Sequence, residues 1–526
     1  MTTLEAATED LGDTPVPDDP AEQVSRPLLP TWVVNVVLIG IVAFGIAVRL
    51  YSRSTLWLDE ALSVNISKLA VGDIFEALRH DGHPPLYYVM LHYWMEVFGD
   101  GDIAVRLLSS VFSVATLPLA WIAGRRVAGL TGARWALVVV ALSPYCVRYA
   151  TETRMYSLVM LLALGGYLLL DDALKRPTWP RLAGIAVVSG LLLLSHYWAI
   201  WLLGAVGLLL AWRWWRAPDE RPATLRSMLA IAAGGVLFLP WLSSFLYQSS
   251  HTGTPWGKPF RPTSALAITL ADMSGGLNFF DAHLAATLIV LLCLLALFTA
   301  RAAGNRLALD LGTVPRVRRE LAVATLTFGL GIVIAFLTSA TFQSRYAAVI
   351  VPLVLVATAA GVAVLPEKPR LLAGALVIGM SLMGIGWTEY FERTQSADVA
   401  AQVSAHMRPG DVVVYCPDQL GPGYSREMPD DLVELAYPTL AAPDRVDWVD
   451  YADRNAAANP EQIASKVLDR AEGHNIFLVW KGDYQTFGEQ CQDLLTALTQ
   501  DRVAQTVIQV NQDHFYEPAF LTWIQP

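Results

Sequence analysis

Long apolar runs separated by short polar loops dominate the chain as far as about residue 390. A bilayer has a hydrocarbon core of roughly 30 Å, which a helix of about 20 apolar residues crosses. The pattern predicts about eleven spans, of which the shortest borrow residues from their flanks. These spans are residues 31–48, 106–124, 134–147, 155–170, 181–198, 200–212, 227–246, 284–300, 320–340, 346–365 and 371–388.

A shorter apolar stretch at residues 83–99 has a different character. It is too short to span comfortably, and it carries His92 and Glu96 among several Tyr and Trp residues. Aromatic rings and scattered polar groups are typical of helices that lie in the membrane interface. We therefore expect an interfacial helix here, and reading it as a span would reverse the orientation of all that follows.

The pattern changes after about Glu389, where acidic residues outnumber basic ones and the apolar runs become short. Two of these runs, 411–415 and 475–480, predict buried strands, while 460–472 and 487–498 predict amphipathic helices. We expect a mainly α, polytopic membrane helix bundle with a small α/β domain at its end. The predicted parts are a disordered cytoplasmic tail at 1–26, the membrane domain at 27–390 and a soluble extracytoplasmic domain at 391–526.

Composition supports a membrane protein, because 54% of the 526 residues are hydrophobic and only 16% are charged. The net charge of −10 argues against binding to nucleic acid, which requires clustered Lys and Arg. The four cysteines show no metal-ligand spacing. Cys416 and Cys491 lie in the polar C-terminal part, and whether they form a disulfide stays open.

Basic residues set the orientation, because cytoplasmic loops of membrane proteins are enriched in Lys and Arg. Alternate loops are basic here, which places them and the N-terminus in the cytoplasm. The unusual polar groups then all fall on the outer side. The basic residues of these loops are Arg125, Arg126, Lys175, Arg176, Arg213, Arg216, Arg316, Arg318, Arg319, Lys368 and Arg370.

A carboxylate pair, Asp59 and Glu60, follows the first predicted span directly after Trp57 and Leu58. Two acids in the first turn of a helix are ordinarily explained by the helix dipole. At a membrane surface, however, partial desolvation raises the proton affinity of a carboxylate toward the range of a general base. We therefore expect both acids at the catalytic site, with Asp59 as the base.

Other polar groups on the same side are candidates for binding an anion. His83 precedes two prolines, which hold it in an extended turn, and it either binds a ligand or points into water. Arg148 and Arg154 either pair with Glu152 or contact a phosphate. The candidate donor-phosphate or substrate-binding residues are His83, Arg148, Arg154, His196, Lys258, Arg345 and Tyr346.

These groups fit one reaction class. The sequence contains no glycine-rich loop that would cradle a nucleotide. A base at the membrane surface and cations for a phosphate fit displacement of phosphate from a lipid-linked donor, because a phosphate leaving group scarcely needs an acid.

The motifs also resemble those of the GT-C membrane glycosyltransferases, in particular the protein O-mannosyltransferase and aminoarabinose transferase group. The likeness covers about residues 31–390. It rests on Asp59-Glu60, on His83-Pro84-Pro85-Leu86-Tyr87-Tyr88, on Arg154-Met155-Tyr156-Ser157, and on Arg345-Tyr346 followed by Pro352.

The resemblance implies an inverting transfer of a sugar, mannose or arabinose-like, from a polyprenyl-phosphate carrier to an outward-facing hydroxyl of a glycan, lipid or protein. It implies that Asp59 is the base. Some relatives carry lysine where this chain has His83, so that contact with the phosphate carries over less directly. A transporter of such lipids and an inactive assembly partner stay open as alternatives, as does a role for a divalent cation.

Overall fold

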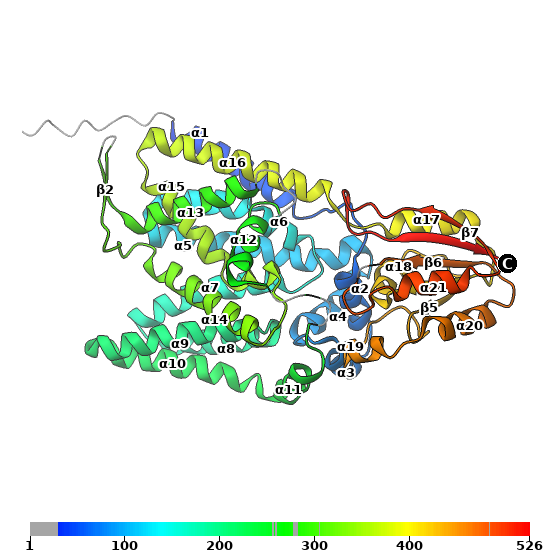
Figure 1. The fold of residues 1–526 in the computed structure, drawn as a ribbon. Coiled ribbons are helices and arrows are strands. Elements are labelled where there is room, and N and C mark those ends of the chain that lie inside the picture. The colour runs from blue at the N-terminus through cyan, green and yellow to red at the C-terminus, as the bar shows by residue number, and fades with distance from the viewer. Residues whose placement is uncertain (1–29, 255–256, 258–259, 277–281, 304–305, 483) are drawn as a thin grey trace, which may run out of the picture.

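The computed structural model describes residues 30–526 apart from 255–256, 258–259, 277–281, 304–305 and 483 (Figure 1). The predicted disordered tail and Lys258 lie outside the described residues. Figure 1 shows a bundle of helices at one end of the molecule and a smaller domain with a sheet at the other. The predicted fold class, a mainly helical membrane protein with a small C-terminal α/β domain, is confirmed.

All of the predicted spans fall largely on helices. In the described part of the chain, four helices are long and apolar enough to cross a membrane, and a bent pair makes a fifth candidate. Shorter apolar helices complete the bundle. The helices of the bundle are α1 (Thr31–Ala47), α5 (Asp102–Ala141), α7 (Tyr156–Lys175), α8 (Trp179–Ser195), α9 (Ala199–Arg216), α10 (Arg221–Val236), α11 (Leu242–His251), α13 (Ala282–Phe298), α14 (Arg318–Leu337), α15 (Val351–Val364) and α16 (Glu367–Tyr390).

Glycine shapes the bundle at two places. Helix α5 contains most of two predicted spans, which are separated at Ala128 and at Gly129, whose φ of 62° falls in the left-handed region. Helices α13 and α15 approach so closely that a Cβ at Gly361 would collide with the carbonyl of Leu292. Small residues allow such close contacts between membrane helices, which associate mainly by packing.

Three helices between α1 and α5 lie where the bundle meets the C-terminal domain (Figure 1). They are α2 (Leu58–Ser67), α3 (Val71–Asp81) and α4 (Leu86–Phe98). Helix α4 occupies the stretch from which an interfacial helix was predicted, and its 13 residues are too few to span a bilayer. The carboxylate pair therefore begins the first of three short helices at one end of the bundle.

The C-terminal domain is built on a five-stranded mixed sheet with the order β5-β4-β6-β9-β7. Strands β4, β5 and β6 are parallel, and β9 runs antiparallel to β6 and β7. Cys416 at the end of β4 forms a disulfide with Cys491 in α21. The strands are β4 (Val412–Cys416), β5 (Val433–Ala436), β6 (Ile476–Trp480), β7 (Val503–Ile508) and β9 (Phe520–Gln525), and the helices predicted from sequence are α20 (Pro460–Ala471) and α21 (Gln490–Leu498).

The two parts of the molecule meet at α2. Trp57, Leu58 and Leu62 are buried in the same apolar cluster as Val412 and Val414 of the sheet. A separate two-stranded pair, β3 (Glu392–Thr394) with β8 (Phe515–Glu517), lies beside this junction. The start of α2 is thus fixed by the C-terminal domain as much as by the membrane bundle.

Candidate active site

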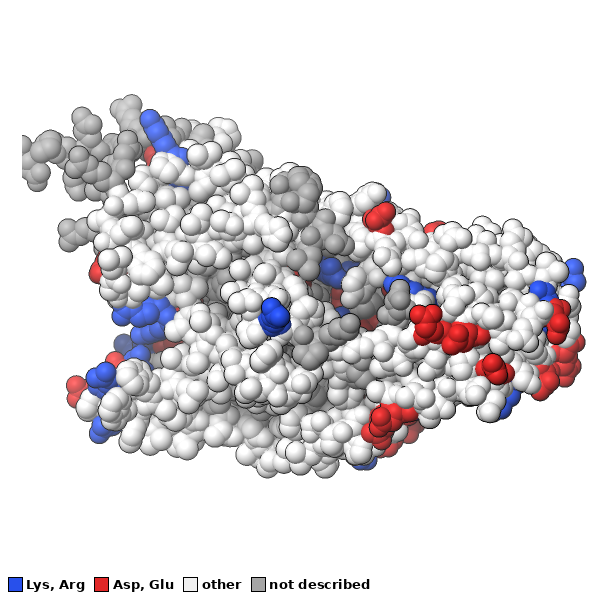
Figure 2. Space-filling view, in the orientation of Figure 1, with Lys and Arg blue, Asp and Glu red and all other residues white. Residues whose placement is uncertain are grey.

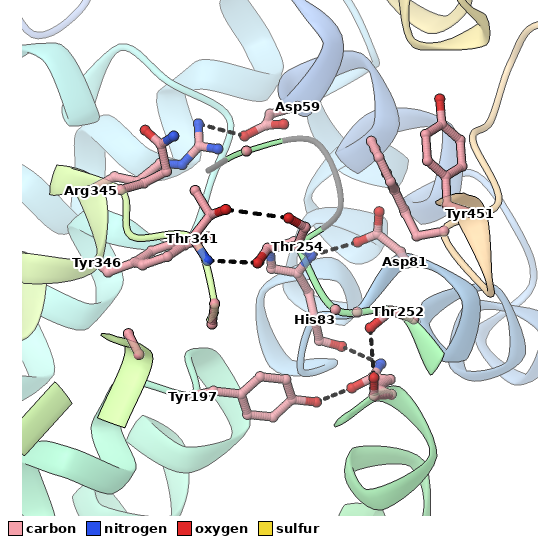
Figure 3. Close-up of a pocket in the computed structure, with 18 of the residues that line it drawn as sticks. Asp59, Asp81, His83, Tyr197, Thr252, Thr254, Thr341, Arg345, Tyr346 and Tyr451 are labelled. Carbon is pink, nitrogen blue, oxygen red and sulfur yellow. Dashed lines mark hydrogen bonds and ion pairs between the residues drawn. The ribbon is translucent and has the colours of Figure 1, made fainter. Parts of the chain in front are cut away.

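A cavity of about 1770 Å³ lies between the C-terminal domain and the end of the bundle that faces it. Figure 3 shows residues of α2, α3, α11 and the segment before α15 converging on it. Of the predicted site residues, the lining includes Asp59, His83, Arg154, His196, Arg345 and Tyr346. The structure therefore brings together side chains that are up to 287 residues apart, from Asp59 to Tyr346.

Asp59 is the centre of the polar part of this cavity. Its Oδ2 lies 2.9 Å from Nη1 of Arg345 and 4.0 Å from Nη2 of Arg154. The side chain is 16% exposed, and its contacts with both arginines are ion pairs through Oδ2. The two guanidinium groups place positive charge beside a carboxylate that can take up a proton, as a general base does.

Arg154 is held rigidly beside Asp59. It is buried, and its Nη1 donates to Ser63 Oγ and to the Tyr88 hydroxyl, each at 3.1 Å. Its Nη2 lies 2.8 Å from Nε2 of His83. Arginine has no acceptor, so Nε2 of His83 accepts this hydrogen bond, and the tautomer follows from the network.

His83 is oriented by a buried acid. With Nε2 accepting from Arg154, Nδ1 carries the proton and donates to Oδ2 of Asp81 at 2.8 Å. The same oxygen of Asp81 accepts from the Tyr88 hydroxyl at 3.0 Å. We did not predict Asp81 from the sequence. Its position two residues before His83 was the signal that could have identified it as a partner of the histidine.

Arg345 is positioned through its backbone. The Tyr145 hydroxyl donates to the carbonyls of Ser344 and Arg345, each at 3.2 Å, and Ser344 Oγ donates to Asp272 at 2.8 Å. The guanidinium lies 5.6 Å from the ring centroid of Trp57. These contacts direct the charge of Arg345 toward Asp59, as Figure 3 shows.

His196 and Tyr346 form an aromatic wall of the cavity, with ring centroids 5.4 Å apart. His196 also packs 5.8 Å from Tyr156. Neither ring makes an ion pair in the described structure. His196 Nδ1 accepts from the backbone N–H of Trp198 at 3.1 Å, and the Tyr346 hydroxyl accepts from Arg345, so that both rings are held in place beside the arginines.

Glu60 lies off the cavity, although it is adjacent to Asp59. Its carboxylate accepts from Nε and Nη2 of Arg106 at 2.8 and 2.7 Å and from Nη1 of Arg393 at 2.9 Å. Burial alone would raise the pKa of Glu60, but the charges of Arg106 and Arg393 lower it to about 2. Since its side chain is completely buried and fully paired, the geometry gives Glu60 a structural role.

Arg148 is also absent from the lining of the cavity. It lies on α6 (Pro144–Ala150), with its guanidinium about 6 Å from the rings of Tyr149 and Tyr516. One of the two interpretations offered for Arg148 and Arg154 was that they pair with Glu152. The structure does not show such pairing, because neither Glu152 oxygen has a hydrogen-bond partner among the described residues. Arg154 instead faces Asp59.

The C-terminal domain supplies cavity residues that sequence reasoning missed, including Tyr516 and Glu517 of β8. Oε2 of Glu517 accepts from the backbone N–H of Leu58 at 3.2 Å. Burial raises the pKa of Glu517 to about 8, and the negative charge of Asp59 acts in the same direction. The ring of Tyr516 lies edge-on to Trp57 at 5.2 Å.

Among the described residues, no group of three or more His, Cys, Asp or Glu side chains could hold a metal ion. The basic side chains of the described cavity lining include the guanidinium groups of Arg154 and Arg345 and the ammonium group of Lys481. Arginine suits an anionic ligand because its planar guanidinium binds phosphate through two parallel hydrogen bonds.

Residues 82–247 match the family model described as dolichyl-phosphate-mannose-protein mannosyltransferase. A comparison with curated protein sequences finds no match.

Solved structures show the fold. The chain is similar to ArnT from Cupriavidus metallidurans in the apo state, with 14% identity, a TM-score of 0.58 and coverage of 94% of this chain and 98% of ArnT. The structure of ArnT bound to undecaprenyl phosphate gives 12% identity, a TM-score of 0.56 and the same coverage. The chain therefore has the fold of the GT-C membrane glycosyltransferases, and the resemblance inferred from its motifs is confirmed.

Proposed function

We propose that this protein is an inverting glycosyltransferase that moves a sugar from a polyprenyl-phosphate donor to an extracytoplasmic hydroxyl. One observation carries the proposal: Asp59 contacts both Arg154 and Arg345 in a cavity at the end of the bundle next to the C-terminal domain. That arrangement combines a base with two cations, and this reaction needs both.

The proposed step is a single displacement. The acceptor oxygen attacks the anomeric carbon of the donor while Asp59 takes the hydroxyl proton on Oδ1. The bond from the anomeric carbon to the phosphate oxygen breaks, and the polyprenyl phosphate leaves with the electron pair. Arg154 and Arg345 stabilise the charge that develops on the phosphate, and the configuration at the anomeric carbon inverts.

The comparisons support a lipid-linked donor. The matching family model is named for dolichyl-phosphate mannose, and one ArnT structure is described as bound to undecaprenyl phosphate. Both carriers are polyprenyl phosphates, which favours this class of donor here. We propose mannose or an arabinose-like sugar as the group transferred.

An outward-facing site agrees with two further features. The disulfide between Cys416 and Cys491 fits an oxidising compartment. Basic residues gather at the opposite end of the bundle, where Arg126, Lys175 and Arg319 all pair with Asp171. Figure 2 shows a bundle surface nearly free of charge between these ends. We propose a multi-pass membrane protein with a cytoplasmic N-terminus and an extracytoplasmic C-terminal domain.

The alternative of a transporter is less well supported. Transporters place their substrate sites near the bilayer midplane, at broken helices. Here the paired charges around Asp59 lie beside the C-terminal domain, and Asp59 itself belongs to a short helix outside the bundle. The position of the site favours chemistry at the membrane surface.

The test is transfer of radiolabelled sugar from polyprenyl-phosphate mannose and polyprenyl-phosphate arabinose in membranes that contain the protein and envelope acceptors. We expect Asp59→Asn to lower the transfer rate by at least roughly 10³-fold, because it removes the base while preserving the shape of the side chain. Asp73→Asn is the matched control, since Asp73 lies exposed on the neighbouring helix α3.

Wild-type transfer by Asp59→Asn would exclude Asp59 as the base. No transfer from either donor by intact wild-type protein, with no binding of polyprenyl phosphate, would contradict the proposed function.

A further inference from the structure

The cavity is electrically divided. The wall formed by the membrane domain carries Arg154 and Arg345 around Asp59. The wall formed by the C-terminal domain carries Asp450 and Asp453, with Lys481 as its basic side chain among the described lining residues, and Glu517, whose ionisation burial opposes. An anionic group is attracted to the first wall and gains little from the second. The second wall therefore suits an uncharged ligand.

Tyr516 gives this second wall an aromatic surface. Its side chain is 47% exposed although it lines the cavity, and its position is fixed by the edge-on contact with Trp57. A ring that is held in place and open on one side is a stacking platform for the C–H face of a sugar ring. Such a platform contributes little to binding a phosphate.

Glu517 adds hydrogen-bonding groups next to that ring. One carboxyl oxygen accepts from the Leu58 N–H, and the residue lines the cavity. Since burial raises the pKa of Glu517 to about 8, the carboxyl is neutral at pH 7 and has an O–H to donate. A carboxyl that can both donate and accept matches a sugar hydroxyl, which does the same.

The position of these groups relates them to the chemistry. Glu517 binds the amide of Leu58, and Asp59 is the next residue of α2. A ligand that contacts Tyr516 and Glu517 therefore lies next to the proposed base. Arg154 and Arg345 contact Asp59 itself, and they are the groups proposed for the donor phosphate.

One edge of β8 is already paired, which disfavours a peptide that would add a strand at that edge. The strand pairs with β3, and the carbonyl of Glu517 accepts from the Tyr424 hydroxyl and from the backbone N–H of Gln395. A peptide that added a strand there would need those groups free. The side chains of Tyr516 and Glu517 are the groups that line the cavity and can contact a saccharide.

Resting on the proposed glycosyl transfer, we propose that Tyr516 and Glu517 form the acceptor subsite and that the acceptor is an uncharged saccharide. Tyr516 stacks against the sugar ring, and Glu517 holds a hydroxyl. The acceptor is thereby presented to Asp59 from the C-terminal domain, and the donor from the membrane.

Ligand binding without turnover tests this assignment. Saturation-transfer NMR titrations of the full chain in nanodiscs would use methyl glycosides and short neutral oligosaccharides of mannose and arabinose. Mannose 6-phosphate and a Ser/Thr-containing peptide represent the competing acceptor classes. Binding of polyprenyl phosphate, measured on the same samples, reports on the donor side separately.

We expect the neutral saccharides to bind the wild-type protein, and Tyr516→Ala and Glu517→Leu to weaken that binding by at least roughly tenfold. Glu517→Gln keeps a donor and an acceptor of the same shape, so its binding should remain close to wild type. Asp513→Asn is the matched control, because Asp513 is exposed near this strand and does not line the cavity. Polyprenyl phosphate should bind all four variants.

Saccharide binding that is equal in wild type, Tyr516→Ala and Glu517→Leu would overturn the subsite. Preferential binding of mannose 6-phosphate or the peptide would overturn the proposed acceptor class. If polyprenyl phosphate still binds in either case, the proposed function stands and only the acceptor assignment fails.

Discussion

At the scale of single residues, the adjacent acids Asp59 and Glu60 lie in different surroundings. Asp59 faces the cavity and forms ion pairs with Arg345 and Arg154 through Oδ2, whereas Glu60 is buried between Arg106 and Arg393. Adjacent residues on a helix point about 100° apart, so one pair of acids faces two environments. We infer that Glu60 stabilises the structure around the site, whereas Asp59 takes part in the reaction.

This division predicts a stability effect. Glu60→Ala leaves two buried arginines without their carboxylate, which costs about 3–5 kcal/mol of folding free energy. Because the pKa of Glu60 is lowered from 4.5 to about 2, its contribution is present above about pH 4.5 and is lost as the pH falls through 2. Thermal unfolding of purified protein in detergent at pH 7 measures the loss.

Glu96→Ala is the control for this measurement, since Glu96 is 60% exposed and forms an ion pair with His92 at a distance of 3.6 Å. We expect the control to unfold at close to the wild-type temperature. Equal unfolding temperatures for Glu60→Ala and wild type would show that the buried ion pairs do not stabilise the junction.

At the scale of helices and strands, the sequence predicts many of the elements but not the contacts between elements that are distant in sequence. The strands at β4 and β6 and the helices α20 and α21 follow from local hydrophobic patterns. Orientation from the basic loops predicts that Asp59, His83, Arg154 and Arg345 share one side. Local patterns cannot reveal that β8 reaches α2, since Tyr516 and Glu517 are more than 450 residues from Asp59.

The disulfide between β4 and α21 predicts a second stability effect. It closes a loop with a sequence separation of 75 residues, and constraining such a loop in the unfolded state stabilises a domain by roughly 4 kcal/mol. We expect Cys416→Ser with Cys491→Ser to lower the unfolding temperature of the C-terminal domain, as read by limited proteolysis over a temperature series.

The buried Cys146 provides the control, because Cys146→Ser changes a thiol that forms no disulfide. Proteolysis of the double variant at wild-type temperatures would indicate that the bridge adds nothing to this domain.

At the scale of the whole molecule, the site belongs to neither part alone. Apolar contacts of Trp57 and Leu58 join α2 to the sheet domain, and Arg393 joins Glu60 to the segment after α16. The bundle contributes Arg154 and Arg345 and α2 contributes Asp59, the proposed base, while the C-terminal domain supplies the facing wall of the cavity. The proposed transfer requires the donor to enter from the membrane side of Asp59.

The most direct test is a cryo-EM structure of the Asp59→Asn variant in nanodiscs with polyprenyl-phosphate mannose. The phosphate should contact Arg154 and Arg345, with the anomeric carbon within about 4 Å of the substituted side chain at position 59 and its open face toward Tyr516. A phosphate bound elsewhere, with the anomeric carbon remote from position 59, would contradict the account.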